Sequence, residues 1–292
     1  MENINQWTWK QEWQSRQKNP LSLLLHLLVC GATVATFLGI LFIVGYILVK
    51  GIPHLSPSLF EWTYDSQNVS LLPALINTIY MTILALVMAV PIGIGSSIYL
   101  TEYARRDHLF VRVIRIATET LAGIPSIIYG LFGALFFVKF AGMGLSLLSG
   151  AVTLSIMILP LIMRTTEEAL LSVPDGYREG AFALGAGKIR TIGWIVLPSA
   201  LPGIFSGVIL AIGRIVGESA ALIFTAGTVA EVAKNLFSST RTLAVHMYAI
   251  SGEGLYVNQT YATAVVLLVL VIVINLISEL IARRLGSESS DE

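Results

Sequence analysis

The chain has 292 residues, of which 55% are hydrophobic and 12% are charged, and its mean hydropathy is +0.78. Soluble domains carry about 25% charged residues, so this composition excludes an ordinary soluble domain and indicates an integral membrane protein. The 18 basic and 18 acidic residues cancel, so nothing indicates a nucleic-acid partner, and the single Cys30 excludes an internal disulfide.

Six stretches are apolar and long enough to cross a bilayer, which takes about 20 residues. We expect spanning helices over Leu21–Val49, Leu72–Leu100, Val113–Phe140, Leu145–Met163, Ile195–Ala226 and Ala262–Ile281. The first stretch is too long for the apolar region of a signal peptide, so we expect it to remain as a signal anchor. The sequence therefore predicts an all-α, polytopic membrane protein with six transmembrane helices.

These spans divide the chain into five parts. The first is a cytoplasmic N-terminal tail, where Trp7, Trp9 and Trp13 favour an interfacial helix. The parts are the tail at 1–20, the first transmembrane helix at 21–49, an outer loop at 50–71, a core transmembrane domain at 72–282 that includes the loop 164–194, and a cytoplasmic C-terminal tail at 283–292.

The distribution of Lys and Arg predicts the orientation. If the N-terminus is inside, 13 of the 18 basic residues lie in cytoplasmic segments, four lie outside, and Arg214 lies within a span. Cytoplasmic loops carry the excess of Lys and Arg, so both termini are predicted to be cytoplasmic. The loop 164–194 is then also cytoplasmic.

That loop carries helix start and stop signals. A possible cap at Ser172, an early Pro174 and the stop residues Gly185 and Gly187 predict a short helix, and a second one is expected over Lys188–Trp194. Loops of about 30 residues are long for a simple connection between helices. We therefore expect a rigid element that docks onto a soluble partner, the alternative being a mere connector.

The same loop carries a motif. Glu179-Gly180-Ala181 is followed after three residues by Gly185 and, after nine more, by Ile195-Val196-Leu197-Pro198. This spacing resembles the Glu-Ala-Ala motif of ABC importer permeases, with Gly180 in place of the second Ala. Gly in a helix costs up to about 1 kcal/mol relative to Ala.

Further stretches resemble the PstA-type permeases of phosphate importers, and together they cover most of Asn77–Asn275. They are "NTIYMTILALVMAVPIGIGSSIYLTEYA", "RIATETLAGIPSIIYGLFG", "GRIVGESAALIFTAG" and "SSTRTLAVHMY". The resemblance implies a type I ABC importer permease fold in a bacterial or archaeal plasma membrane. It also implies that the loop is a coupling helix docking onto an ATP-binding subunit, with coupling residues Glu179, Gly180, Ala181, Gly185, Ile195, Leu197 and Pro198.

The resemblance implies three kinds of protein partner. They are a sister permease that completes a heterodimer, an ATPase dimer that holds ATP-Mg, and an extracytoplasmic phosphate-binding protein expected to face the segment Arg241–Tyr248. The chain itself has no P-loop, because Phe182 stands at the first glycine position of that motif and Ile189 follows Lys188. We therefore expect a permease that is not an enzyme and binds no cofactor or metal.

Two pairs of charged residues lie four positions apart in or near the predicted spans. Arg214 and Glu218 lie in the fifth predicted span, where a charge is costly and a guanidinium suits an oxyanion. We expect them to form an ion pair on the substrate pathway, the alternative being a purely structural pair. Arg115 and Glu119 form the second pair, and Glu119 with Pro125 are candidates for gating.

Glycines along the fifth predicted span follow the same helical spacing. Gly203 with Gly207, and Gly213 with Gly217, form two Gly-x-x-x-Gly steps that let helix backbones approach closely. This pattern fits both rocking helices and ordinary membrane packing.

Two alternatives to phosphate import remain. The cargo of such an importer can be another oxyanion (phosphonate, molybdate or sulfate), or the chain can be a stand-alone channel. An intramembrane enzyme is disfavoured, because the spans hold no Ser/His, paired-Asp or metal-ligand arrangement.

Overall fold

A computed structural model describes residues 20–104 and 108–288, and all regular structure within these ranges is helical. The long helices are α2 (Pro20–Gly51), α3 (Leu72–Ile98), α6 (Leu147–Ser172), α9 (Leu197–Val216) and α12 (Val257–Glu288). The shorter helices are α4 (Leu109–Ala122), α5 (Ser126–Gly133), α7 (Asp175–Ala183), α8 (Lys188–Thr191), α10 (Ala220–Thr225) and α11 (Leu243–Glu253).

Short π-helical and 3₁₀ segments connect or extend these helices. The π-helical segments are η3 (Tyr99–Tyr103) after α3, η4 (Ala134–Phe140) after α5 and η5 (Ile192–Val196) before α9, and the 3₁₀ turns are η1 (Ile52–His54) and η2 (Pro57–Phe60). The predicted interfacial helix within 1–20, with Trp7, Trp9 and Trp13, lies outside the described residues.

Five helical runs are long and apolar enough to cross a membrane, and a bent pair makes a sixth if it counts as one span. The five are Leu21–His54, Leu72–Tyr103, Leu147–Ser172, Lys188–Val216 and Val257–Leu280. The bent pair, Leu109–Ala122 with Ser126–Phe140, turns by 104°. The predicted six spans are therefore reached only if the bent pair is counted as one span.

The span expected over Val113–Phe140 is not one continuous helix. The α4 helix ends at Ala122, and Pro125 occupies the cap position before α5. Proline has no N–H to continue the helical hydrogen bonds and disfavours helical backbone at Ile124, which explains the break. The predicted fifth span is also interrupted, because α9 ends at Val216 and α10 begins only at Ala220.

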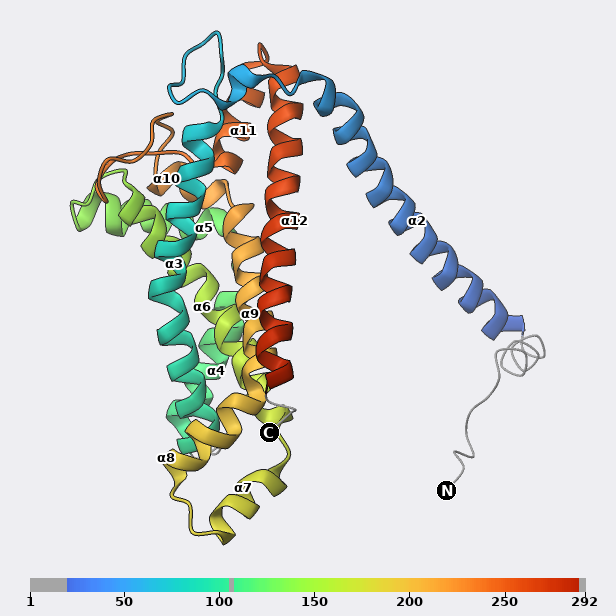
Figure 1. Cartoon of the computed structure of the whole chain (residues 1–292), viewed down its shortest axis with the longest axis vertical. Helices are drawn as coiled ribbons and strands as arrows, with labels where there is room; N and C mark the ends of the chain where they lie inside the picture. The colour runs from blue at the N-terminus through green and yellow to red at the C-terminus, as the bar shows by residue number, and fades with distance from the viewer. Residues whose placement is uncertain (1–19, 105–107, 289–292) are drawn as a thin grey trace.

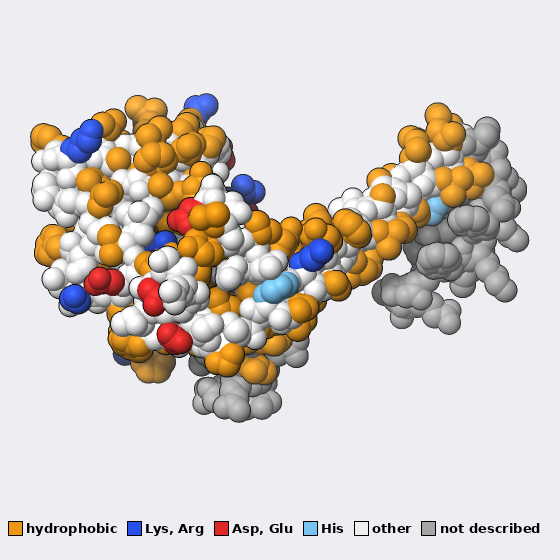
Figure 2. All heavy atoms as spheres, turned by 90° about the horizontal axis from the view of Figure 1, so that it is seen from above, with side chains coloured by type: hydrophobic (Ala, Val, Ile, Leu, Met, Phe, Trp, Pro, Cys, Tyr) orange, Lys and Arg blue, Asp and Glu red, His pale blue; other side chains and the backbone are white. Residues whose placement is uncertain are grey.

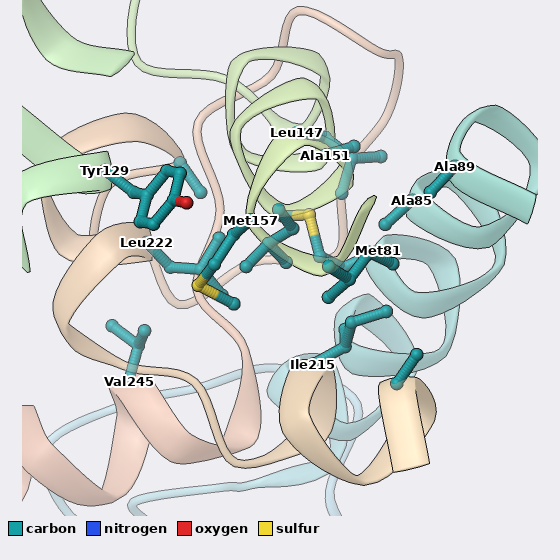
Figure 3. Close-up of a cluster of buried hydrophobic side chains, with 14 of the residues drawn as sticks. Met81, Ala85, Ala89, Tyr129, Leu147, Ala151, Met157, Ile215, Leu222 and Val245 are labelled. Atoms are coloured by element: carbon teal, nitrogen blue, oxygen red, sulfur yellow. The ribbon is translucent and has the colours of Figure 1, made fainter. Parts of the chain in front are cut away.

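The core of the molecule forms where α3, α6 and α9 pack together. The α6 helix lies at its centre, and 61% of its most apolar window is buried. Figure 3 shows Met81 and Ala85 of α3, Met157 of α6 and Ile215 of α9 gathered in one cluster. Tyr129, Leu222 and Val245 bring α5, α10 and α11 to the same cluster, so these short helices are held by the central bundle.

Small residues allow α9 to approach α6 closely. A Cβ atom at Gly203 would lie 2.7 Å from Cβ of Ala169, and one at Gly207 would overlap the hydroxyl of Thr165. The first Gly-x-x-x-Gly step is thus a close helix contact. A Cβ at Gly213 meets nothing within 4 Å, so the second step does not have this role.

The α2 helix leaves the bundle. Figure 1 shows it leaning away from the other helices, and Figure 2 shows hydrophobic side chains covering the described part of this arm. None of its most apolar window is buried. It is attached near its C-terminal end, where the rings of Tyr46 and Tyr261 of α12 meet edge to face at 5.8 Å.

The two ends of the bundle differ. In Figure 1 the lower end carries α7 and α8, and the upper end carries α11 and the segment between η1 and α3. We call these the α7 end and the α11 end.

Candidate functional site

The α7 end is built around the predicted loop helix. The helix starts at Asp175 rather than near Ser172, because α6 continues to Ser172 and Pro174 takes the cap position. Gly185 ends it with a φ of +81°, a left-handed conformation that favours glycine. The predicted second helix is α8, which continues through η5 into α9, so the loop is directly connected to a long helix.

Large apolar side chains project from this end of the bundle. Leu184, Ile189 and Trp194 are 91%, 79% and 81% exposed. An open groove of about 810 Å³ runs along this surface, lined by Tyr103 and residues of 187–194. The loop therefore presents clustered apolar side chains at its surface, as interaction surfaces commonly do.

The remaining motif residues divide between surface and core. Glu179 and Gly180 are exposed, whereas Ala181 is buried, and α7 packs on α8 and η5. Ile195, Leu197 and Pro198 are half-buried at the start of the long helix. The motif therefore joins an exposed helix to the packed core.

An ion pair ties α7 to the end of α3. Arg178 Nη2 lies 2.7 Å from Glu102 Oε1, and the two side chains are only 15% and 9% exposed. Arg178 also donates to the carbonyl oxygens of Leu170 and Val173 and to Asp175. Lys188 lies 4.9 Å from the ring centre of the neighbouring Tyr103. Sequence reasoning missed the Arg178–Glu102 pair, because the two residues are far apart in the sequence and no local pattern links them.

Arg214 lies in the last turn of α9, and it is half-buried. The expected ion pair with Glu218 does not form among the described residues. The helix ends at Val216, and Glu218 instead accepts a hydrogen bond from the N–H of Ala221 at 3.1 Å, at the start of α10. Arg214 therefore has no carboxylate partner in the described part of the chain.

The second expected pair is also replaced. Arg115 pairs with Glu167 of α6 at 2.6 Å, rather than with Glu119 one turn along its own helix. Glu119 is exposed and lines a cavity of about 400 Å³ between α4 and α6. Arg164 and Glu168 line the same cavity. Pro125 lies at the start of α5 and positions the break between α4 and α5.

The described residues contain no group of three or more His, Cys, Asp or Glu that could hold a metal ion. Two separate features make up the candidate site. One is the surface of exposed apolar side chains at the α7 end, and the other is Arg214, which lies within the bundle and pairs with no described carboxylate.

Known proteins resemble this chain in sequence and in fold. Residues 89–287 match the family described as "Binding-protein-dependent transport system inner membrane component". The phosphate transport system permease protein PstA of Yersinia pestis is 34% identical over 93% of this chain and 92% of its own length. The probable ABC transporter permease protein YqgI of Bacillus subtilis is 34% identical over 78% of this chain and 81% of its own length.

Solved structures share the fold at lower identity. A bacterial ABC transporter involved in the import of alginate matches with a TM-score of 0.64 and 17% identity, over 94% of this chain and 99% of that one. The MetNI methionine ABC transporter in an inward-facing conformation matches with a TM-score of 0.56 and 22% identity, over 83% of this chain and 97% of that one. These likenesses confirm the predicted all-α importer permease fold, and the chain belongs to the binding-protein-dependent transport system inner membrane component family.

Proposed function

We propose that this chain is a permease subunit of an ATP-driven phosphate importer. The observation that carries the proposal is the α7 end, where the permease motif begins on a short helix and is accompanied by exposed Leu184, Ile189 and Trp194. This surface suits docking to a separate ATPase. Relatives named as phosphate transport permeases support phosphate as the cargo.

The proposed complex contains two permeases, an ATPase dimer and an external phosphate-binding protein. Here the α7 end and both termini face the cytoplasm, which places the α11 end toward the binding protein. ATP-Mg binds only the ATPase, because the chain lacks a P-loop of its own. The exposed apolar surface of α2 is available to lipid and to the sister permease.

Force from the ATPase passes through α7 in this proposal. The Arg178–Glu102 pair connects α7 to η3 and α3, and η5 connects α8 to α9. Both α3 and α9 pack on α6, so movement of α7 reaches the helices that form the core. Arg214, at the far end of α9, then meets the anion with an unpaired guanidinium.

Substitution at Leu184 tests the docking role. Because Leu184 is 91% exposed, Leu184→Asp does not disturb the packing of the chain, yet it places a charge in the proposed interface. We expect the ATPase to co-purify at least about tenfold less well with this variant, and ATP-driven phosphate uptake to fall accordingly. Leu255→Asp is the matched control, since Leu255 is 80% exposed at the α11 end.

Normal ATPase binding and uptake by Leu184→Asp would show that α7 does not dock. The cargo is tested separately by competition in the same uptake assay. Phosphate should compete, and phosphonate, molybdate and sulfate should not. Preferred uptake of one of those anions would replace phosphate, and uptake without the ATPase would identify a channel.

A further inference from the structure

The segment before α11 does not have the open surface that sequence reasoning expected. Arg241 and His246 were expected to face an external protein, yet they are 5% and 0% exposed. Tyr248 alone of the named residues is open, at 60%. Because its side chain is buried, Arg241 cannot obtain its hydrogen-bond partners from the surface of an external protein.

Several buried polar atoms here have no hydrogen-bond partner among the residues that the structure describes. They are Nε and Nη2 of Arg241, Oγ1 of Thr242, and both ring nitrogens of His246. Buried polar groups are nearly always paired, because an unpaired one retains its cost of desolvation. Five such atoms within six residues therefore make this segment a candidate for binding a polar ligand.

One aromatic ring brings the two basic side chains together. The guanidinium carbon of Arg241 lies 4.6 Å from the ring centre of Tyr64, and the imidazole of His246 meets the same ring edge to face at 6.0 Å. No carboxylate in the described residues pairs with Arg241. Burial and the charge of Arg241 lower the pKa of His246 to about 3, so its imidazole is neutral at physiological pH.

The amino end of α11 adds a positive potential beside these side chains, and hydrogen bonds to α3 hold this segment in place. Thr242 occupies the cap position of the 11-residue helix α11, but its side chain makes no capping hydrogen bond. The amino end of a helix attracts anions. Asn77 donates to the carbonyl of Arg241, and the N–H of Leu243 donates to Thr78, so two residues of α3 hold this segment.

We propose that Arg241, Thr242 and His246 form a binding site for a small tetrahedral oxyanion at the α11 end. Nε and Nη2 lie on one edge of the guanidinium and suit two parallel hydrogen bonds to such an ion. The hydroxyl of Thr242 and one N–H of His246 provide further donors. Because Arg241 is 95% buried, a free ion fits this site better than a carboxylate carried by another protein.

This site is separate from Arg214. Figure 3 shows Ile215, next to Arg214 in sequence, and Val245, next to His246, within one buried cluster, so the helices that carry the two sites belong to the same core. That the bound ion is the transported phosphate rests on the proposed function, whereas the anion chemistry rests only on the unpaired donors.

Direct binding to the whole complex tests the site without relying on transport. The assembled transporter is placed in nanodiscs without its binding protein, carrying Arg214→Gln so that the other proposed site is silent. Equilibrium dialysis with radiolabelled inorganic phosphate should show one saturable site. We expect sulfate to compete and chloride not to, because the donors match a tetrahedral oxyanion.

Two substitutions and a control identify the residues. Arg241→Lys keeps the charge but loses the two parallel N–H donors of the guanidinium, and it should weaken phosphate binding by about tenfold. Thr242→Val should weaken it by a few-fold and still assemble, because it removes only an unpaired hydroxyl of similar shape. Lys234→Gln should bind normally, since Lys234 lies in the same segment with its side chain 81% exposed.

Binding as tight in Arg241→Lys and Thr242→Val as in the parent complex would overturn the site. So would the absence of phosphate binding in the parent, or equal competition by chloride. Failure of the proposed function would appear differently, as anion binding that persists in a complex without ATP-driven uptake.

Discussion

At the residue scale, the molecule departs most from sequence reasoning in its charged side chains. Helical spacing predicted that Arg214 pairs with Glu218 and Arg115 with Glu119, and neither pair forms. In the first case the helix ends between the two residues, and in the second a carboxylate on another helix is closer. Spacing along one helix identifies neighbours only if the helix continues and no tertiary partner competes.

The burial of His246 predicts a pH dependence of stability. Its pKa is about 3 in the folded chain, against an ordinary value of 6.5, because burial and the charge of Arg241 disfavour the protonated ring. The unfolded chain therefore takes up a proton that the folded chain excludes as pH falls below 6.5. Stability should decrease from pH 6.5 toward pH 3 for this reason.

Amide hydrogen exchange in α11 of the purified complex, measured between pH 7 and pH 5 and corrected for intrinsic exchange rates, checks this prediction. Local protection should fall with pH, and His246→Gln should reduce that pH dependence. His54→Gln is the control, because His54 is exposed. An identical pH dependence in the wild type and His246→Gln would contradict the assignment.

At the element scale, the α6–α9 contact is tightest at Gly207. A methyl group at Gly207 would overlap Thr165, whereas one at Gly213 meets nothing within 4 Å. Gly207→Ala should therefore destabilise the chain by about 1–3 kcal/mol through overpacking. Gly213→Ala, on the same helix, should be neutral or stabilise it by up to about 1 kcal/mol.

Denaturant titration of the two purified variants measures this difference. The order of stability should be Gly213→Ala, then wild type, then Gly207→Ala. Equal stability of the two variants would mean that α6 and α9 can separate at this contact without cost.

The link between α7 and α3 gives a second prediction at this scale. Removing Glu102 leaves Arg178 without its main carboxylate, and breaking a buried pair costs about 3–5 kcal/mol, with the low end expected here because some exposure remains. Glu102→Ala should loosen α7, so that the complex hydrolyses ATP but imports less phosphate per ATP. Glu168→Ala should behave like the wild type, because the Arg164–Glu168 pair is 69% and 62% exposed.

The ratio of phosphate imported to ATP hydrolysed in proteoliposomes is the measurement. An unchanged ratio in Glu102→Ala would restrict the Arg178–Glu102 pair to a local structural role.

The sequence predicted most of the long helices, because in a membrane a run of about 20 or more apolar residues must pair its backbone N–H and C=O groups within itself, and a helix does this. The run Leu21–Val49 became α2 with almost the same ends, and Gly185 ends α7 as expected. The size of the bend at Pro125, which is 104°, could not be predicted, because proline inside a membrane helix causes anything from a slight kink to a full break. The Arg178–Glu102 and Arg115–Glu167 pairs depend on tertiary packing, which hydropathy does not contain.

At the scale of the whole molecule, two regions of opposite character lie at the two ends of one helical bundle. The α7 end exposes apolar side chains such as Leu184, and the α11 end encloses Arg241 among unpaired donors. The helices α3, α6 and α9 connect these ends through one core. This arrangement suits a protein that receives movement at one end and handles an anion toward the other.

Phosphate uptake by an Arg214→Gln transporter tests the account most directly. Arg214 is half-buried at the end of α9 and has no carboxylate partner among the described residues, so the substitution leaves none of their acids unpaired. Glu218→Gln is the control, because a glutamine oxygen can still accept the hydrogen bond from Ala221 that Glu218 accepts now. Uptake and ATP hydrolysis are measured in proteoliposomes that contain the complete complex, normalised to assembled complex. The account predicts that Arg214→Gln assembles and hydrolyses ATP but imports at least about tenfold less phosphate, a loss of about 1.4 kcal/mol or more. Near wild-type uptake by Arg214→Gln would contradict it and remove this arginine from the path of the anion.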